Sequence, residues 1–167
     1  MLLTGLKLFR ACFCKILVCP IANVNFPYLR CMLSKKTKYG LKALTFLASQ
    51  EGRVPVQISE IAKHENISQK FLESILLTLR KTGILGSKKG KGGGYYLIKD
   101  PKDIPMTTVM RVLEGPIAMV PCVSLNFYEK CGDCPDEASC SVHKLMLQVR
   151  DSTLEVFRNN TLADLVP

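Results

Sequence analysis

The stretch from Ile58 to Lys99 constrains the fold more than any other, because it joins an amphipathic helix to a basic hairpin. Apolar side chains recur at helical spacing along one side of residues 68–81. They are Phe71, Leu72, Ile75, Leu76 and Leu79. Ser68 is a residue type that caps helix N-termini, and Gly83 suits the left-handed conformation that ends a helix. We therefore predict a helix over this stretch with one face packed on a small core.

Two short apolar runs, 84–87 and 95–98, follow that helix and are joined by a glycine-rich loop that carries Lys88, Lys89 and Lys91. This pattern predicts a β-hairpin with the three lysines at its tip. Ahead of the helix, the sequence predicts a shorter helix that turns at Asn66. Two short helices separated by a tight turn form a helix-turn-helix, and the hairpin makes it winged.

The whole chain divides into four segments of different character. Residues 1–31 form an extension, and residues 32–105 are expected to form the winged helix-turn-helix domain, with a first core helix that begins at Ser34 and is closed by Gly52. Residues 106–140 predict a short helix and a cysteine-rich loop, and residues 141–167 a long dimerisation helix and a tail. The predicted fold class is mainly α with a small β-hairpin wing.

The helix predicted from residue 141 has apolar or small residues at alternating steps of three and four, the spacing of a contact between two helices. These residues are Val142, Leu145, Val149, Ser152 and Val156. They either pack on the chain's own first domain or form the seam of a homodimer. The dimer is preferred, because DNA-binding domains of this size usually read two half-sites.

The extension over residues 1–31 resembles nothing that follows it. Its apolar stretch is interrupted by Lys7, Arg10 and Lys15, so it predicts neither a transmembrane helix nor a typical signal peptide. We expect Met32 to be the biological start and the upstream segment to be a gene-model artefact or a disordered tail.

Basic side chains concentrate where the winged domain is predicted. Residues 32–102 carry 14 basic and 5 acidic side chains, whereas residues 103–167 carry 5 basic and 9 acidic ones. A positive field that coincides with a docking element is typical of a phosphate-binding face, although a merely soluble, lysine-rich surface has the same composition. We therefore expect double-stranded DNA as a partner.

The exposed start of the 68–81 helix is expected to enter the major groove, where each base pair presents a distinct set of donors and acceptors. Gln69 suits adenine, Lys70 suits guanine or a phosphate, and Glu73 can accept from a cytosine amino group. Ser74 completes this set of four candidate readers.

Five further side chains suit the DNA backbone. Lys88, Lys89 and Lys91 suit phosphate or minor-groove contacts at the wing tip. Lys38 and Tyr39, at the start of the first helix, are also candidates for backbone contact. The three glycines at 92–94 would alternatively bind a nucleotide phosphate, but the lysine and hydroxyl residues of a P-loop are missing.

A second candidate site lies in the cysteine-rich loop, whose three prolines and weak periodicity indicate that something other than a hydrophobic core orders it. Its five candidate metal ligands are Cys122, Cys131, Cys134, Cys140 and His143. Four ligands suffice for a 2Fe-2S cluster or a zinc ion. The last four of the five would make a closed zinc site, and thiolates this close would also serve as a redox switch.

Short motifs distributed from residue 38 to residue 165 carry a resemblance to a known family. They are Lys38-Tyr39-Gly40, Ile67-Ser68, Phe71-Leu72-Glu73, Leu79-Arg80-Lys81, Gly92-Gly93-Gly94-Tyr95 and Thr161-Leu162-Ala163-Asp164-Leu165. With the Met32 start and the cysteine loop, residues 32–167 resemble the winged-helix regulators typified by the iron-sulfur cluster regulator IscR. The resemblance implies a homodimeric bacterial transcription factor, often a repressor, and in many members an iron-sulfur cluster that tunes DNA affinity.

The resemblance also bears on individual residues. It matches Glu73 to the family's recognition-helix glutamate, which favours a specificity role over a solvated surface acid. The family pattern has three cysteines separated by five residues and a histidine three positions after the last, and Cys134, Cys140 and His143 match its second half. Tyr128 stands where the first cysteine is expected, so Cys131 or Cys122 would have to replace it.

The leading hypothesis is a cytoplasmic, homodimeric, sequence-specific regulator of transcription that is expected to repress and to bind a 2Fe-2S cluster. The alternative is a zinc-stabilised structural or protein-interaction module, although a protein-docking face would not need so strong a basic bias. No paired acid and base, activated nucleophile or cofactor fingerprint is evident in the sequence. We therefore expect no enzymatic activity, no small-molecule substrate and no membrane association.

Overall fold

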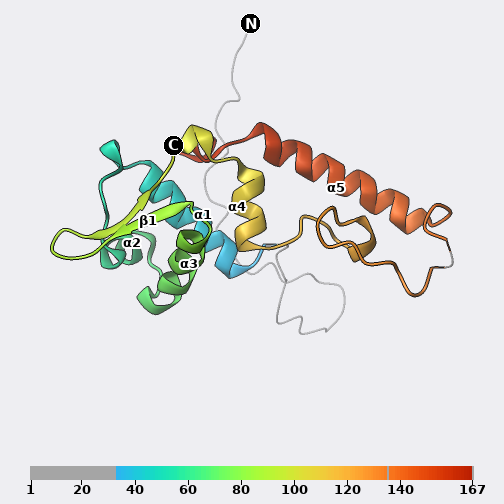
Figure 1. The fold of residues 1–167 in the computed structure, drawn as a ribbon, viewed down its shortest axis with the longest axis horizontal. Coiled ribbons are helices and arrows are strands. Elements are labelled where there is room, and N and C mark those ends of the chain that lie inside the picture. The colour runs from blue at the N-terminus through green and yellow to red at the C-terminus, as the bar shows by residue number, and fades with distance from the viewer. Residues whose placement is uncertain (1–32, 135, 167) are drawn as a thin grey trace, which may run out of the picture. The chain divides into compact units, whose positions relative to one another are not determined.

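The computed structural model describes residues 33–134 and 136–166, so the predicted extension and Met32 lie outside the described residues. Five α-helices and a two-stranded antiparallel sheet follow one another along this part of the chain (Figure 1). Their bounds are α1 Lys35–Ala48, α2 Ile58–Glu65, α3 Gln69–Lys81, β1 Leu85–Lys88, β2 Gly94–Leu97, α4 Met106–Leu113 and α5 Ser141–Asn159. Short 3-10 helices are η1 Glu51–Arg53, η2 Pro101–Asp103, η3 Pro121–Val123 and η4 Leu162–Leu165. The arrangement confirms the mainly α fold with a hairpin wing.

One apolar cluster holds α1 to α4 and the hairpin together. Leu72, Ile75, Leu76 and Leu79 are completely buried in it, as the helical spacing predicts. The fifth residue of the predicted core face, Phe71, is 39% exposed, so the prediction of a core position is wrong for this residue. Phe71 lies at the edge of the buried stripe, where its ring meets the ring of a residue of α1 rather than the centre of the core.

The C-terminal tail also belongs to this core. Leu162 of η4 is completely buried in the cluster, and its amide donates to the carbonyl of Ile104 at 2.9 Å. The amide of Met106 in turn donates to the carbonyl of Asn160 at 3.0 Å. The end of α5 is therefore fixed to the start of α4, while the rest of α5 extends away from the winged domain (Figure 1).

The helix ends agree with the sequence in part. Helix α1 ends at Ala48, earlier than predicted, and Gly52 lies within η1 instead. Ser68 is the N-cap residue of α3, as predicted, but its hydroxyl makes no capping hydrogen bond. Gly83 follows the C-cap residue with φ of 76°, the left-handed conformation that glycine adopts with little strain.

A carboxylate connects the start of α1 to the end of α4. Glu114 accepts hydrogen bonds from the amide of Ser34 at 3.2 Å, from the hydroxyl of Ser34 at 2.8 Å and from the hydroxyl of the buried Thr37. Burial raises the pKa of Glu114, but the hydrogen bonds from Thr37 and Ser34 and the charge of Lys36 together lower it below its ordinary value. The negative charge also lies at the positive end of the α1 dipole, where it is favourable.

The wing is a short hairpin that is attached to the helix-turn-helix. Its register pairs Leu85 with Leu97 and Lys88 with Gly94, and Tyr95 forms an isolated bridge with Val56 ahead of α2. A side chain at position 94 would collide with the carbonyl oxygen of Val56, so this close approach requires glycine. The glycine-rich sequence thus allows the hairpin to lie against the segment before α2.

Candidate DNA interface and cysteine site

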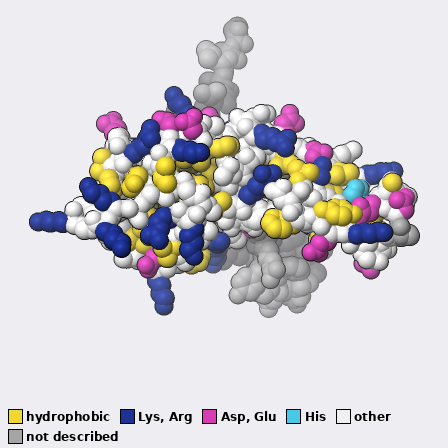
Figure 2. Space-filling view, in the orientation of Figure 1, with side chains coloured by type: hydrophobic (Ala, Val, Ile, Leu, Met, Phe, Trp, Pro, Cys, Tyr) yellow, Lys and Arg dark blue, Asp and Glu magenta, His cyan; other side chains and the backbone are white. Residues whose placement is uncertain are grey.

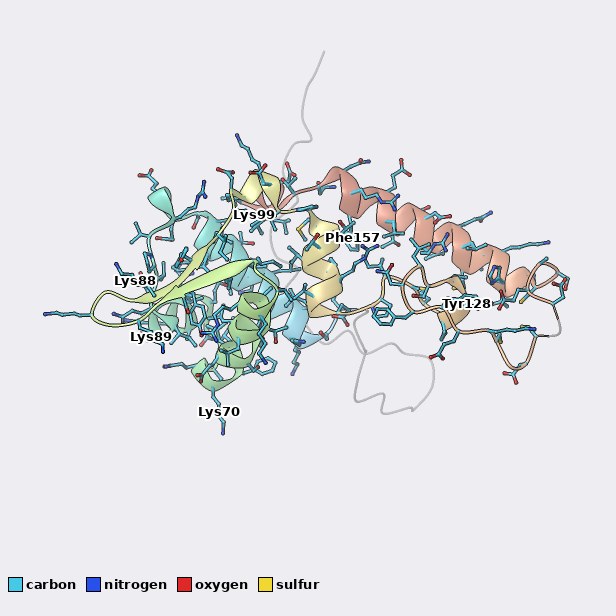
Figure 3. All side chains as sticks on the ribbon, viewed as in Figure 1. Lys70, Lys88, Lys89, Lys99, Tyr128 and Phe157 are labelled. Carbon is cyan, nitrogen blue, oxygen red and sulfur yellow. The ribbon has the colours of Figure 1, made fainter. Side chains whose placement is uncertain are left out.

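The first turns of α3 present the four predicted base readers to solvent. Gln69, Lys70, Glu73 and Ser74 are all exposed, and their spacing of one and four residues groups them on one surface of the helix. Figure 3 shows Lys70 extending away from the domain. Ser74 donates its hydroxyl proton to the carbonyl of Phe71 at 2.7 Å, so at a base edge this hydroxyl is left to accept.

The start of α1 lies beside this surface. Lys38 is exposed, whereas Tyr39 is half-buried and packs against the core cluster. The Tyr39 ring meets the ring of Phe71 edge to face, with centroids 5.8 Å apart and planes at 80°. The aromatic pair therefore connects the two candidate contact residues of α1 to the reading face of α3.

The three lysines of the wing are exposed. Lys88 ends β1, and Lys89 and Lys91 lie in the turn beyond it. Among the described residues, no ion pair involves any of these three side chains or Lys70. Lysines and arginines stand out over the winged domain in the space-filling view (Figure 2). These charges are thus available to phosphates.

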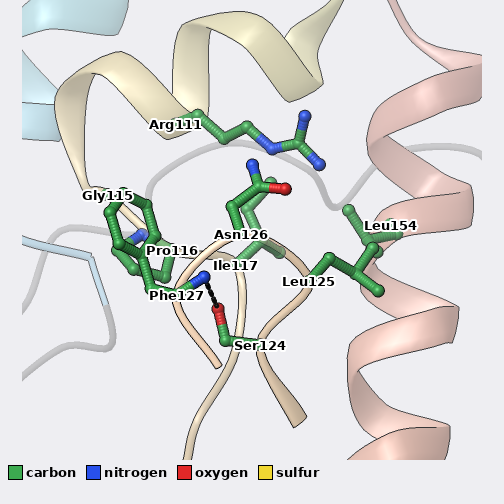
Figure 4. Close-up of a pocket in the computed structure, with 9 residues that line it drawn as sticks. All are labelled: Arg111, Gly115, Pro116, Ile117, Ser124, Leu125, Asn126, Phe127 and Leu154. Atoms are coloured by element: carbon green, nitrogen blue, oxygen red, sulfur yellow. Dashed lines mark hydrogen bonds between the residues drawn. The ribbon is translucent and has the colours of Figure 1, made fainter. Parts of the chain in front are cut away.

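The cysteine loop is joined to the middle of α5 by a side chain of that helix and is also ordered by a hydrogen bond of its own. Arg150 of α5 is largely buried and donates to the carbonyl of Val123 in η3 at 2.7 Å. The amide of Phe127 donates to the hydroxyl of the buried Ser124 at 3.1 Å (Figure 4). A small cavity of about 50 Å³ remains between this part of the loop, α4 and α5.

Two cysteines lie close together at the junction of the loop and α5. The Sγ atoms of Cys134 and Cys140 are 3.8 Å apart. Cys140 is also the N-cap of α5, and its sulfur accepts from the amide of His143 at 3.4 Å, which lowers the pKa of the Cys140 thiol. Hydrogen bonds with Cys131 and Cys140 raise the pKa of Cys134 to about 12. The loop therefore brings three thiols together and favours one of them as the thiolate.

The remaining candidate ligands differ in their surroundings. The Nδ1 atom of His143 is buried, and none of the described residues hydrogen-bonds to it. Burial, together with the negative charge of Glu137, raises the pKa of the Cys122 thiol. Tyr128, at the position of the expected first cysteine, donates to Glu137 at 3.0 Å and so faces a carboxylate.

The side chains are of the chemical types that hold a metal through thiolates and an imidazole, because neighbouring thiols occur together with a buried imidazole nitrogen to which no described residue hydrogen-bonds. Within the described part of the chain, however, no three histidine, cysteine or acidic side chains are already arranged to hold a metal ion. Bound metal would therefore have to draw the ligands closer together.

Two residues that shape these sites are not evident from the sequence. Phe71 fits the apolar period of α3, so the sequence predicts that it is buried. The one indication of its exposure is that it lies at the edge of the apolar face of the helix, next to Lys70 in the sequence. Arg150 carries no signal, since a single arginine on a long helix usually faces solvent.

None of the described helices is both long enough and apolar enough to cross a membrane.

Comparisons with known proteins agree with the geometry of the winged domain. Residues 33–167 match the Rrf2 family, which is described as an iron-dependent transcriptional regulator. An Rrf2-like HTH-type transcriptional regulator of Rhodobacter capsulatus is 42% identical over 138 residues, which cover 81% of this chain and 92% of that protein. The HTH-type transcriptional regulator CymR of Bacillus subtilis is 32% identical over 133 residues, which cover 80% of this chain and 88% of that protein.

Solved structures show the same relationship. The structure of CymR, the global cysteine regulator of B. subtilis, has a TM-score of 0.66 and 34% identity, with coverage of 81% of this chain and 96% of that one. The structure of T. potens IscR has a TM-score of 0.62 and 33% identity, with coverage of 80% and 84%. The match to the family begins at Leu33 and extends to Pro167. This chain therefore belongs to the Rrf2 family of winged-helix, DNA-binding transcriptional regulators.

Proposed function

We propose that this chain is a homodimeric, cytoplasmic transcriptional repressor that reads DNA with α3 and changes its affinity through a 2Fe-2S cluster in the cysteine loop. The observation that carries the DNA-binding part is that α3 presents exposed polar readers and the wing presents three lysines that form no ion pair with any described residue. Arg80 of α3 donates to Ser87 of β1 at 3.3 Å, so the helix and the wing are attached to each other. A cytoplasmic location suits both the DNA partner and thiols that must stay reduced.

The dimer is supported by the exposed apolar face of α5. Val142, Leu145 and Val156 are 57%, 54% and 59% exposed, whereas among the described side chains of α5 only Leu154 is buried. These exposed residues belong to the predicted seam with its steps of three and four, together with Val149 and Ser152. Pairing the seams of two copies would cover the apolar face and give a dimer with two winged domains, one for each half-site.

The cluster would be held by Cys131, Cys134, Cys140 and His143. Cys134 and Cys140 are adjacent, and none of the described residues hydrogen-bonds to the buried Nδ1 atom of His143. Cys131 is near enough to Cys134 to raise its pKa, whereas Tyr128, at the position of the expected first cysteine, has no thiol. Cys122 remains the alternative to Cys131. When bound, a 2Fe-2S cluster supplies an iron centre whose oxidation or loss can act as a signal. The description of the family as iron-dependent supports iron over the zinc alternative.

Regulation would act through the junction at Cys140. This residue is both a candidate ligand and the N-cap of α5, so the cysteine loop and the proposed dimer helix meet at one side chain. Loss of the cluster from Cys140 would free the loop and the first turn of α5. The two winged domains of the dimer would then no longer be held at a fixed spacing, and the affinity for the operator would change.

Anaerobic purification of the full chain tests the cofactor. Iron and acid-labile sulfide in equal amounts, with visible absorption bands, are expected, whereas a colourless protein with stoichiometric zinc would contradict the cluster. Cys131→Ser should lower the iron content and Cys122→Ser should leave it unchanged. The reverse result would assign the fourth position to Cys122.

Selection of duplexes from a random pool by the full chain tests the DNA-binding part. A palindromic consensus is expected, and a reporter placed behind that sequence should be repressed by the chain. Recovery of a random set of duplexes would contradict sequence-specific binding whatever the cofactor proves to be.

A further inference from the structure

Phe71 is an apolar side chain on an otherwise polar reading surface. It is 39% exposed, while Lys70 before it and Ser74 one turn later are both exposed. A single exposed apolar residue is ordinary on a protein surface and needs no explanation by itself. What requires an explanation is that Phe71 borders the reading surface, one turn from the candidate base reader Ser74.

The ring of Phe71 is held in place before any DNA arrives. Its edge-to-face contact with Tyr39 is 5.8 Å between centroids, and Tyr39 is itself packed on the core cluster. The Ser74 hydroxyl bonds to the carbonyl of Phe71 at 2.7 Å and so occupies the backbone acceptor next to the ring. A ring supported from one side loses little conformational freedom when a partner covers the other side.

The major groove offers one apolar group at its base edges, the C5-methyl group of thymine. Phe71 lies on the side of α3 that faces α1, whereas Gln69 and Glu73 follow one another on the other side. The two sides would therefore meet different base pairs. We propose that Phe71 is a specificity-determining residue that packs its exposed ring against a thymine methyl group in each half-site, a role that rests on the DNA-binding function proposed above.

Replacement of single thymines by deoxyuridine tests this role, because it removes the methyl group and keeps every hydrogen-bonding atom. The probe is the duplex selected by the full-length protein, with each symmetric pair of thymines replaced in turn. Burial of one methyl group corresponds to about fourfold in affinity, and two half-sites to about fifteenfold. We expect a loss of this size at one symmetric pair with the wild-type chain.

The variant Phe71→Ala should bind the thymine and deoxyuridine duplexes with equal affinity at that pair. Val54→Ala serves as the matched control, because Val54 is 60% exposed in the winged domain outside α3, and it should keep the wild-type discrimination. If no thymine pair in the selected duplex is sensitive to the methyl group in the wild-type chain, the role of Phe71 is refuted even where the alanine variant fails to fold. Equal sensitivity in the wild-type chain and Phe71→Ala also refutes it, while failure to select any sequence refutes the DNA-binding proposal instead.

Discussion

Replacement of Lys89 by alanine separates affinity from sequence reading on the proposed interface. The side chain is exposed in the wing turn, and no ion pair among the described residues involves it. A lysine that neutralises one phosphate releases condensed counterions and contributes about 0.9 to the slope of log affinity against log salt. In a dimer the two copies of Lys89 would contribute about 1.8. Between 50 and 200 mM salt, the wild-type chain should therefore lose about tenfold more affinity than Lys89→Ala.

Fluorescence anisotropy with one labelled duplex, repeated at several salt concentrations, measures this slope. Lys99→Ala is the matched control, since Lys99 is also an exposed lysine of the winged domain and lies away from Lys70 in Figure 3. Its slope should equal that of the wild-type chain. A Lys89→Ala variant with weakened binding but an unchanged slope would show that this side chain does not contact phosphate, and the assignment of the wing to backbone contact would be wrong.

Three further predictions address the reading helix, the dimer and the fold. Glu73→Ala should leave the salt slope unchanged and lower the preference for the selected operator over variants at one position by about tenfold, from the 1–3 kcal/mol of a specific base contact, as measured by competition binding. Leu145→Glu should convert the dimer to a monomer in sedimentation velocity, because burying a carboxylate in the apolar seam removes its hydration. Lys144→Glu, at an exposed position outside the seam, should stay dimeric. Glu114→Gln should destabilise the fold by about 1 kcal/mol near neutral pH, or about 3 °C in melting temperature. Because the pKa of Glu114 is lowered in the folded state, that difference is present above its ordinary value and should vanish as the pH falls through the lowered pKa.

The winged domain could be predicted closely because its elements have strong local signals. The apolar period of α3, the glycine after its end and the lysine and glycine turn of the wing each specify local geometry on their own. The prediction of burial is wrong where the apolar period describes a whole helix and not the surroundings of one residue. Phe71 has the right period but lies at the edge of the stripe, and only the three-dimensional position of Tyr39 determines its environment.

The long-range contacts of the fold have no such local signal. Glu114 reads as an ordinary residue at the end of a short helix, yet it accepts hydrogen bonds from Ser34 and Thr37 at the start of α1. Leu162 lies in a tail with no clear period, and it is completely buried. Each of these contacts joins segments far apart in the chain, so spacing within either segment cannot reveal it.

The geometry of the cysteine site likewise could not be predicted from spacing within one segment. Five candidate ligands can be counted in the sequence, but their arrangement depends on the path of a loop with little core. The structure brings Cys134 to 3.8 Å from Cys140 and places Cys140 at the N-cap of α5. A thiolate in that position accepts the His143 amide and also faces the positive end of the helix dipole, so the helix favours the charged form that a metal requires. The start of the proposed dimer helix would thus stabilise the Cys140 thiolate as a metal ligand. Binding of the metal to that thiolate would in turn stabilise the start of the helix, and such reciprocal coupling is what a sensor of this design needs.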